Sequence, residues 1–251
     1  MMQRTYRYEE MLPDEFLQAV EKTPVFIVPT GLLEWHADHL PLGQDALKAH
    51  GICEAIARKL GGGIVLPPNY YGRPGYASYV GTLTFSDRCL TLLFTELLGE
   101  LEKVGARVVL ILTGHYGPCQ VDFVKKVAAD FQAAHPDMRI IAQPEYEGVL
   151  VEGESPEDHA GLWETSMFWH FYPHLTHMDK FHEIPNRKRY YDNPPNDFYH
   201  EQEEWKFGDP VLPRASRELG AKAVDIISDH IAARLRAALA ELGLAVEDAN
   251  A

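Results

Sequence analysis

RVVLILTGHYGPCQVDFVKKVAADFQAAHPDMRIIA, residues 107–142, contains the plainest secondary-structure pattern in the chain. The apolar run Arg107–Leu112 predicts a buried strand. Residues Gln120–Ala134 place apolar side chains at helical spacing, and Arg139–Ala142 is a second short apolar run. A strand, a helix and a strand in this order predict a βαβ unit with two parallel strands.

The same alternation continues on both sides of this unit. Further strands are expected at Val25–Val28 and Ile64–Leu66. Helices are expected at Ala46–Leu60, at Asp87–Val104, at Leu162–Tyr172 and from about Arg214 to Leu242, the last one with a possible break near Gly220. A chain of 251 residues is ordinary for one α/β domain, so we expect a single domain over residues 1–251. Its sheet should be mainly parallel and covered by helices on both faces.

One segment, Lys180–Pro210, departs from this pattern because it is rich in aromatic, charged and proline residues. Loops of this length are usually functional or belong to an interface, although a plain surface excursion remains an equal alternative.

Composition excludes several classes of protein. The formal net charge of −14 and the lack of a basic stripe argue against binding to nucleic acid or to anionic membranes. No apolar run approaches the roughly 20 residues needed to cross a bilayer. Three widely spaced cysteines, Cys53, Cys89 and Cys119, and an N-terminus without a signal-peptide core predict a protein of the cytoplasm.

The first candidate site follows the first strand, in PTGLLEWHADHLPLGQD, residues 29–45. Glu34 and His36 point the same way in an extended segment, and Asp45 begins the next helix. Imidazole and carboxylate groups together suit Zn²⁺ or Mn²⁺. A solvated polar loop, with Asp45 as an ordinary helix cap, is the alternative.

Two more clusters follow later in the chain. In LTGHYGP, residues 112–118, His115 lies between glycines at the end of the central strand. In DHAGLWETS, residues 158–166, Asp158 and His159 could act as a general acid/base with its charge partner. Glu164 opens a helix, where a carboxylate also favours the helix dipole.

Taken in order, these motifs resemble the creatininase (creatinine amidohydrolase) family. The resemblance rests on residues 29–45, on Thr113-Gly114-His115 and on His159-Ala160-Gly161 with Glu164-Thr165-Ser166. Weaker matches are Gly81-Thr82-Leu83-Thr84 and Gly208-Asp209-Pro210 with Ala215. The resemblance to this family implies a three-layer α/β/α sandwich and a homo-oligomer, with a hexamer favoured.

The resemblance also implies a centre of one or two divalent ions, Zn or Mn with Fe as an alternative. Its ligands would be Glu34, His36, Asp45, His115 and a further glutamate, with Asp45 bridging. True creatininases carry a glutamate two residues after the glycine-framed histidine, where this chain has Gly117. Other family members that lack this glutamate use the glutamate of the Glu-Thr-Ser motif, so the resemblance implies Glu164 as the fifth ligand. The departure at Gly117 puts creatinine itself in doubt as the substrate.

The expected activity is that of a metal-dependent hydrolase acting on a small neutral cyclic substrate. Hydroxide activated by the ions would attack a carbonyl carbon, and His159, oriented by Asp158, would protonate the leaving group. Cleavage of a cyclic amide or related C–N bond is the first expectation. Hydrolytic C–C cleavage of a cyclic sugar ketone such as a dehydro-inosose is the alternative, and a non-catalytic member stabilised by metal is the competing class.

Other residues receive secondary roles. Tyr116, Tyr190, Tyr191 and Trp205 are candidates for the wall of the substrate pocket. His39 matches a family histidine and is expected to lie behind the ligands. Trp163 and Trp169 are expected in the core, and Cys119 is expected to be a buried, inert thiol because no base accompanies it.

Overall fold

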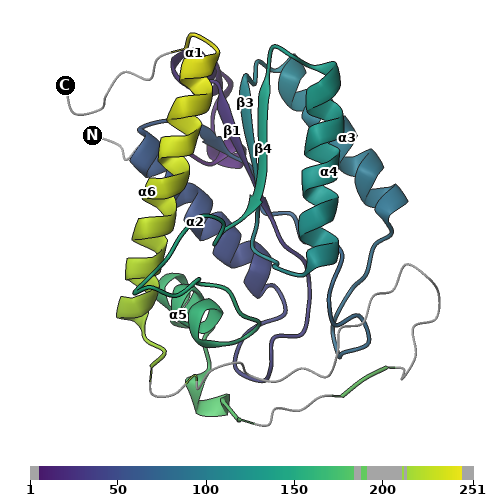
Figure 1. Ribbon diagram of the computed structural model, residues 1–251, viewed down its shortest axis with the longest axis vertical. Coiled ribbons are helices and arrows are strands. Elements are labelled where there is room, and N and C mark those ends of the chain that lie inside the picture. The colour runs from purple at the N-terminus through teal and green to yellow at the C-terminus, as the bar shows by residue number, and fades with distance from the viewer. Residues whose placement is uncertain (1–5, 184–187, 191–210, 212–213, 245–251) are drawn as a thin grey trace.

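The computed structural model describes residues 6–183, 188–190, 211 and 214–244. Within these residues the chain forms one sheet of parallel strands in the order β2-β1-β3-β4 (Figure 1). The strands are β1 (Val25–Thr30), β2 (Ile64–Val65), β3 (Val108–Thr113) and β4 (Arg139–Pro144). The predicted strands and their parallel arrangement are confirmed.

Helices connect and cover these strands. They are α1 (Pro13–Lys22), α2 (Gln44–Leu60), α3 (Asp87–Lys103), α4 (Pro118–Ala134), α5 (Leu162–Phe171) and α6 (Arg217–Glu241), with short 3-10 turns at Tyr8–Glu10 and Met178–Lys180. Within the described part of the chain, no helix is long and apolar enough to span a membrane.

Two apolar cores give the molecule its layers, because successive side chains of a strand face opposite sides of the sheet. Val25 and Ile27 pack with α2, α5 and α6, whereas Phe26 and Val28 pack with α1, α3 and α4. Figure 1 shows α2 and α6 on one side of the strands and α3 and α4 on the other. The predicted three-layer α/β/α sandwich is confirmed.

Three details differ from the expectations. Helix α1 was not expected; it places Ala19 in the core, with Phe16 and Val20 packed against it. Helix α6 runs through Gly220 without a break. Most of the segment expected as an excursion lies outside the described residues, including 184–187 and 191–210.

The order of the strands predicts a crevice between the carboxyl ends of β1 and β3. The chain leaves β1 through α2 to reach β2 on one side, and then crosses through α3 to β3 on the other side of β1. Such a reversal between two neighbouring strands is where ligands bind in open α/β sheets, outside the carboxyl ends of the strands. The first candidate motif follows β1 and the second follows β3, so both lie at this crevice.

Candidate metal centre

The amino end of α2 lies directly against the ends of β1 and β3. A Cβ atom on Gly31 would stand 2.3 Å from the backbone nitrogen of Ala46, and one on Gly114 would stand 2.3 Å from the backbone oxygen of Asp45. Only glycine permits this approach of backbone to backbone. Because of it, the side chain of Asp45 enters the site between the residues that follow the two strands.

The first ligand group consists of Glu34, Asp45 and His115, all of them buried. Nδ1 of His115 lies 3.0 Å from Oε2 of Glu34 and 3.2 Å from Oδ2 of Asp45. The other oxygen of Glu34 accepts hydrogen bonds from the backbone N–H groups of Gly75 and Tyr76, at 2.8 and 2.9 Å. Those two bonds fix the carboxylate so that Oε2 faces the group.

The second ligand group consists of His36, Asp45 and Glu164. Nε2 of His36 lies 3.0 Å from Oδ1 of Asp45 and 3.4 Å from Oε2 of Glu164. Asp45 therefore belongs to both groups and turns one oxygen to each. Such an arrangement suits a carboxylate that bridges two cations.

The protonation of His36 tests whether this set of residues suits a metal ion. Its Nδ1 lies 3.0 Å from the backbone carbonyl of Glu34, which only accepts, so Nδ1 carries the proton of the neutral ring. Nε2 is then a bare acceptor that faces two carboxylate oxygens. Among the described residues, this atom, both oxygens of Asp45 and Oε2 of Glu34 lack a hydrogen-bond partner. Buried acceptors in such a cluster need a cation, and the donor set fits a divalent ion.

The pKa values of the two ligand histidines show the same demand for positive charge. Burial alone lowers the pKa of a histidine. For His36 the carboxylates of Asp45 and Glu164 outweigh burial, and for His115 those of Glu34 and Asp45 do so. The pKa of each ring is consequently raised well above its usual range.

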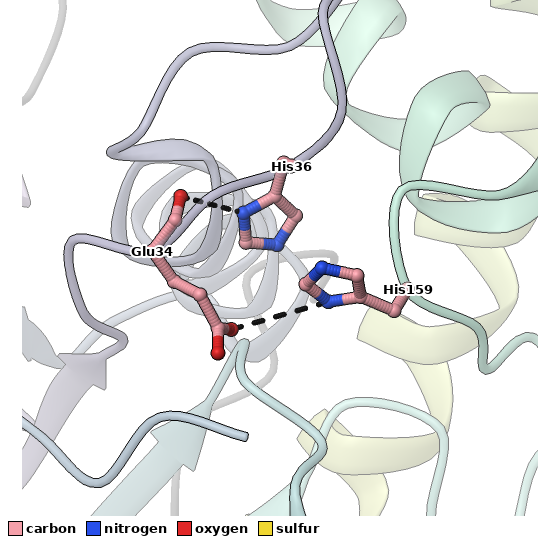
Figure 2. A group of neighbouring side chains, drawn as sticks. All are labelled: Glu34, His36 and His159. Carbon is pink, nitrogen blue, oxygen red and sulfur yellow. Dashed lines mark hydrogen bonds and ion pairs between the residues drawn. The ribbon is translucent and has the colours of Figure 1, made fainter. Parts of the chain in front are cut away.

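His159 faces the same site from the loop before α5. Figure 2 shows its ring beside that of His36, with centroids 4.4 Å apart, and one nitrogen turned toward the carboxylate of Glu34. That nitrogen is Nδ1, at 3.9 Å from Oε2 of Glu34. Nε2 lies 2.9 Å from the carbonyl of Trp35, so it carries the proton of the neutral ring and Nδ1 is the basic nitrogen.

Asp158 has contacts that the sequence did not suggest. Its two oxygens accept hydrogen bonds from the backbone N–H groups of Trp163 and Glu164, at 2.7 and 3.1 Å. These are unpaired donors of the first turn of α5, so Asp158 caps that helix. Burial raises the pKa of Asp158 to about 7. Its expected pairing with His159 stays a prediction.

Two residues of the site were missed from the sequence, Lys48 and Glu145. The ammonium of Lys48 lies 3.0 Å from Oε2 of Glu145, 3.0 Å from Oε1 of Glu164 and 2.6 Å from the hydroxyl of Tyr116. Both charged side chains are fully buried. Lys48 follows Asp45 by one helical turn, and Glu145 directly follows β4, so the same reasoning about strand ends could have found Glu145.

A cavity of about 190 Å³ opens beside both ligand groups. Its wall is formed by Tyr76, His115, Tyr116, Gly117, Glu157, Asp158, His159 and Glu164. The structure therefore places Tyr116 in the pocket wall, as expected. Tyr190 does not belong to this wall: it is exposed, and its hydroxyl accepts a hydrogen bond from the N–H of Gly81 at 3.4 Å. Tyr191 and Trp205 lie outside the described residues.

The remaining expected roles have mixed outcomes. His39 is buried behind the ligands, where its Nε2 lies 2.9 Å from the hydroxyl of Thr165, the neighbour of Glu164. Trp163 is in the core, and Trp169 is half-buried. Cys119 is half-buried too, and its thiol donates to the carbonyl of Arg73 at 3.3 Å, whereas a fully buried thiol was expected.

A family profile described as creatininase, "Creatinine amidohydrolase", matches residues 9–235. Creatinine amidohydrolase from Pseudomonas putida is 25% identical over 181 residues, which cover 64% of this chain and 69% of that protein. The mycofactocin precursor peptide peptidase of Mycolicibacterium smegmatis is 29% identical over 161 residues, which cover 60% of this chain and 59% of the peptidase.

Solved structures share the fold over nearly the whole chain. A crystal structure of creatinine amidohydrolase aligns with a TM-score of 0.74 at 22% identity and covers 93% of this chain and 97% of its own. A structure described as the manganese form of creatininase aligns with a TM-score of 0.70 at 23% identity and covers 93% and 98%. The family match spans most of the sequence, and the chain therefore belongs to the creatininase family of hydrolases.

Proposed function

We propose that this protein is a metal-dependent hydrolase that cleaves an amide or related C–N bond in a small neutral substrate. The observation that carries the proposal is the environment of His36 in a buried site. The unprotonated Nε2 of its neutral ring faces oxygens of Asp45 and Glu164, so hydrogen-bond acceptors face one another with no donor between them. Glu34, Asp45 and His115 would hold one divalent ion, and His36, Asp45 and Glu164 a second. Bound there, the ions would supply a Lewis acid for a carbonyl oxygen and a water activated at neutral pH.

The metal proposed is Zn²⁺ or Mn²⁺, with Fe²⁺ as the alternative. Two imidazoles and three carboxylates suit each of these ions. Related creatininase structures are described as a manganese form and as a Zn–Zn type, which supports the first two.

His159 is proposed as the group that moves the proton. Its Nε2 is held by the carbonyl of Trp35, so Nδ1 is the atom that takes a proton and delivers it to the leaving nitrogen. The ring forms part of the cavity wall next to Glu164 and His115, within reach of a substrate in the cavity. A general acid in this position typically contributes about 10²–10⁴-fold to the rate.

The cavity favours a neutral substrate. Its wall carries carboxylates and tyrosines, and it contains no lysine or arginine among the residues that the structure describes. A substrate carboxylate would have no guanidinium or ammonium to pair with there. A volume of about 190 Å³ also suits a small ring better than a long chain.

Position 117 argues against creatinine as the substrate. A Cβ on Gly117 would stand 2.4 Å from Nε2 of His115, so a glutamate there has no room unless the histidine moves. A cyclic amide other than creatinine is the first candidate. A peptide bond is the second, because four of the curated relatives' names describe a precursor peptide peptidase. A cyclic sugar ketone is the third candidate substrate, because its cleavage also begins with attack on a carbonyl.

The experiment is a turnover assay of the purified protein with its metals quantified. The panel contains creatinine, other cyclic amides, formamides, short peptides and inosose-type ketones, each with and without chelator and with Glu34→Gln. Chelator-sensitive turnover of one compound, lost in Glu34→Gln, is the expected result. If two ions bind and no compound is consumed, the substrate class is wrong and the non-catalytic alternative gains. If no ion binds, the proposal fails.

Two further proposals concern the proton donor and the assembly. His159→Ala should keep the metals and lose turnover, and full activity in this variant would refute its role. Assembly as a homo-oligomer, with a hexamer favoured, is tested by the mass of the native particle in light scattering.

A further inference from the structure

Lys48 is an unusual residue for the interior of a metal centre. Its ammonium is fully buried. It donates to Glu164, to the hydroxyl of Tyr116 and, at 3.1 Å, to the carbonyl of Gly114, and it forms an ion pair with Glu145. Burying an isolated ammonium costs several kcal/mol. Here two carboxylates stand 3.0 Å from the ammonium, those of Glu145 and Glu164, and their attraction opposes that cost.

Glu145 and Tyr116 complete a closed network around this charge. The hydroxyl of Tyr116 accepts from Lys48 and donates to Oε2 of Glu145 at 2.6 Å. Glu145 thereby balances the charge of Lys48 without belonging to either ligand group. Lys48 and Glu145 do not line the cavity, whereas Tyr116 and Glu164 do, so the ammonium of Lys48 acts on the ligand Glu164 and has no direct contact with a substrate.

The two oxygens of Glu164 are held by different donors. Oε1 accepts from Lys48 at 3.0 Å, and Oε2 accepts from the backbone N–H of Ala160 at 2.8 Å. Oε2 is also the oxygen that faces His36 in the second ligand group. The positive charge of the ammonium beside Oε1 repels a second cation from that oxygen, so Oε2, which faces His36, is the oxygen that Glu164 offers to an ion.

We infer that Lys48, balanced by Glu145 and Tyr116, is a positioning residue that makes Glu164 a one-oxygen ligand of the second ion. This inference rests on the proposed two-ion function. The inference also accounts for the glycine at position 117. Glycine has no side chain to bind an ion, so the second ion depends on Glu164, whose orientation depends on Lys48. Residues that orient a ligand in this way typically change metal affinity by about 10–100-fold when they are replaced.

The test separates positioning from plain charge balance. Lys48→Met leaves the carboxylate of Glu145 without its partner, so the double variant Lys48→Met/Glu145→Gln is made as well, which removes both charges. Lys59→Met is the matched control, because Lys59 lies on the same helix and pairs with Asp225 and Asp229 on the surface. The number of Mn²⁺ ions per chain and the affinity of each site are measured by titration calorimetry and elemental analysis.

The double variant should be folded and should bind the first ion within about threefold of wild-type affinity. Its affinity for the second ion should fall by about 10–100-fold. Lys59→Met should bind both ions as wild type does. Wild-type affinity for both ions in the double variant would overturn the inference and show that Lys48 only balances charge.

The proposed function and this inference fail in different ways. A wild-type chain that binds fewer than two ions refutes the two-ion site, and the inference falls with it. Two ions in wild type and in the double variant refute the inference alone. If neither lysine variant folds, Lys48→Gln keeps one N–H donor for Glu164, so its affinity for the second ion should fall by less than about tenfold, and complete loss of the second ion there would overturn the inference.

Discussion

His115 and Gly117 show how closely single residues are matched in this site. The ring of His115 has its Nδ1 at two carboxylates and its Nε2 against the backbone of Gly117. A new methyl group at 117 would stand 2.4 Å from that ring, which real Cβ atoms do not approach. The glycine therefore holds a place that the histidine needs.

We expect Gly117→Ala to weaken the first ligand group specifically. Displacing the ring of His115 should lower affinity for the first ion by at least about tenfold, as loss of ligand orientation does. The second ion, held by His36 and Glu164, should change less. Calorimetric titration of Mn²⁺ measures both. Equal affinities in the variant and wild type would show that the ring can move without consequence.

Two alanines beside the site histidines have backbone conformations that are rare outside glycine. Ala37 has φ +57° and follows His36, and Ala160 has φ +52° and follows His159. Such strain costs on the order of 1–3 kcal/mol each and persists where the surrounding structure imposes it. In both places it turns the chain directly after a side chain that must enter the site.

At the scale of elements, helix α5 is tied to the site by its first turn. Asp158 accepts from the N–H groups of Trp163 and Glu164, and Glu164 is itself a proposed ligand. The cap and the ligand are thus parts of one turn. Capping explains these contacts without any role for Asp158 in proton transfer.

We expect Asp158→Ala to lower the free energy of unfolding by about 0.5–2 kcal/mol, the usual cost of losing a cap. Asp158→Asn keeps one acceptor oxygen and should lose less. Urea denaturation of the metal-free protein measures both changes without interference from catalysis. If Asp158→Ala is as stable as wild type, the cap is unimportant and a direct role beside His159 becomes the better account.

The contact between α5 and α6 explains why α6 continues through Gly220. A Cβ at this position would stand 1.9 Å from the backbone oxygen of Ser166. Glycine is needed there for the two helices to touch, although glycine inside a helix otherwise weakens it. The sequence showed the glycine but not the neighbouring helix, so a possible break was noted there.

Gly220→Ala and Gly99→Ala form a matched pair with opposite expected signs. The first should destabilise the protein by about 1–3 kcal/mol or more, because backbone atoms of α5 cannot move aside easily. Gly99 lies in α3 with nothing within 4 Å of its Cβ position, so alanine there should stabilise by about 0.5–1 kcal/mol. Urea midpoints of both variants check this. A stabilising Gly220→Ala would contradict the close packing of α5 and α6.

At the scale of the whole molecule, the sequence predicted most elements and pointed to the side chains that the structure brings together in the two ligand groups, but not to the residues that support them. Their role as ligands stays a prediction. Apolar runs such as Val108–Leu112 are local signals and were found to within about two residues. Lys48 and Glu145 could not be paired from the sequence, because they are 97 positions apart and look like surface charges in their own helix and strand end. The contact between Lys48 and Glu145 forms only when the folded sheet brings α2 next to the end of β4.

The last prediction concerns the stability of the whole fold with and without metal. Ligands for the proposed ions come from the chain after β1, from α2, from the loop after β3 and from α5, so an ion joins elements that otherwise meet only through packing. An ion that binds only the folded state at 100 times its dissociation constant adds about 2.7 kcal/mol. For a chain of this size that raises the melting temperature by roughly 5–10 °C.

Chelator should reverse the shift, and Asp45→Asn should abolish it because Asp45 belongs to both ligand groups. Scanning calorimetry with Mn²⁺, Zn²⁺ and EDTA measures each case. If neither Mn²⁺ nor Zn²⁺ changes the melting temperature of the wild-type chain, the buried acceptors of His36 and Asp45 are satisfied by protons instead.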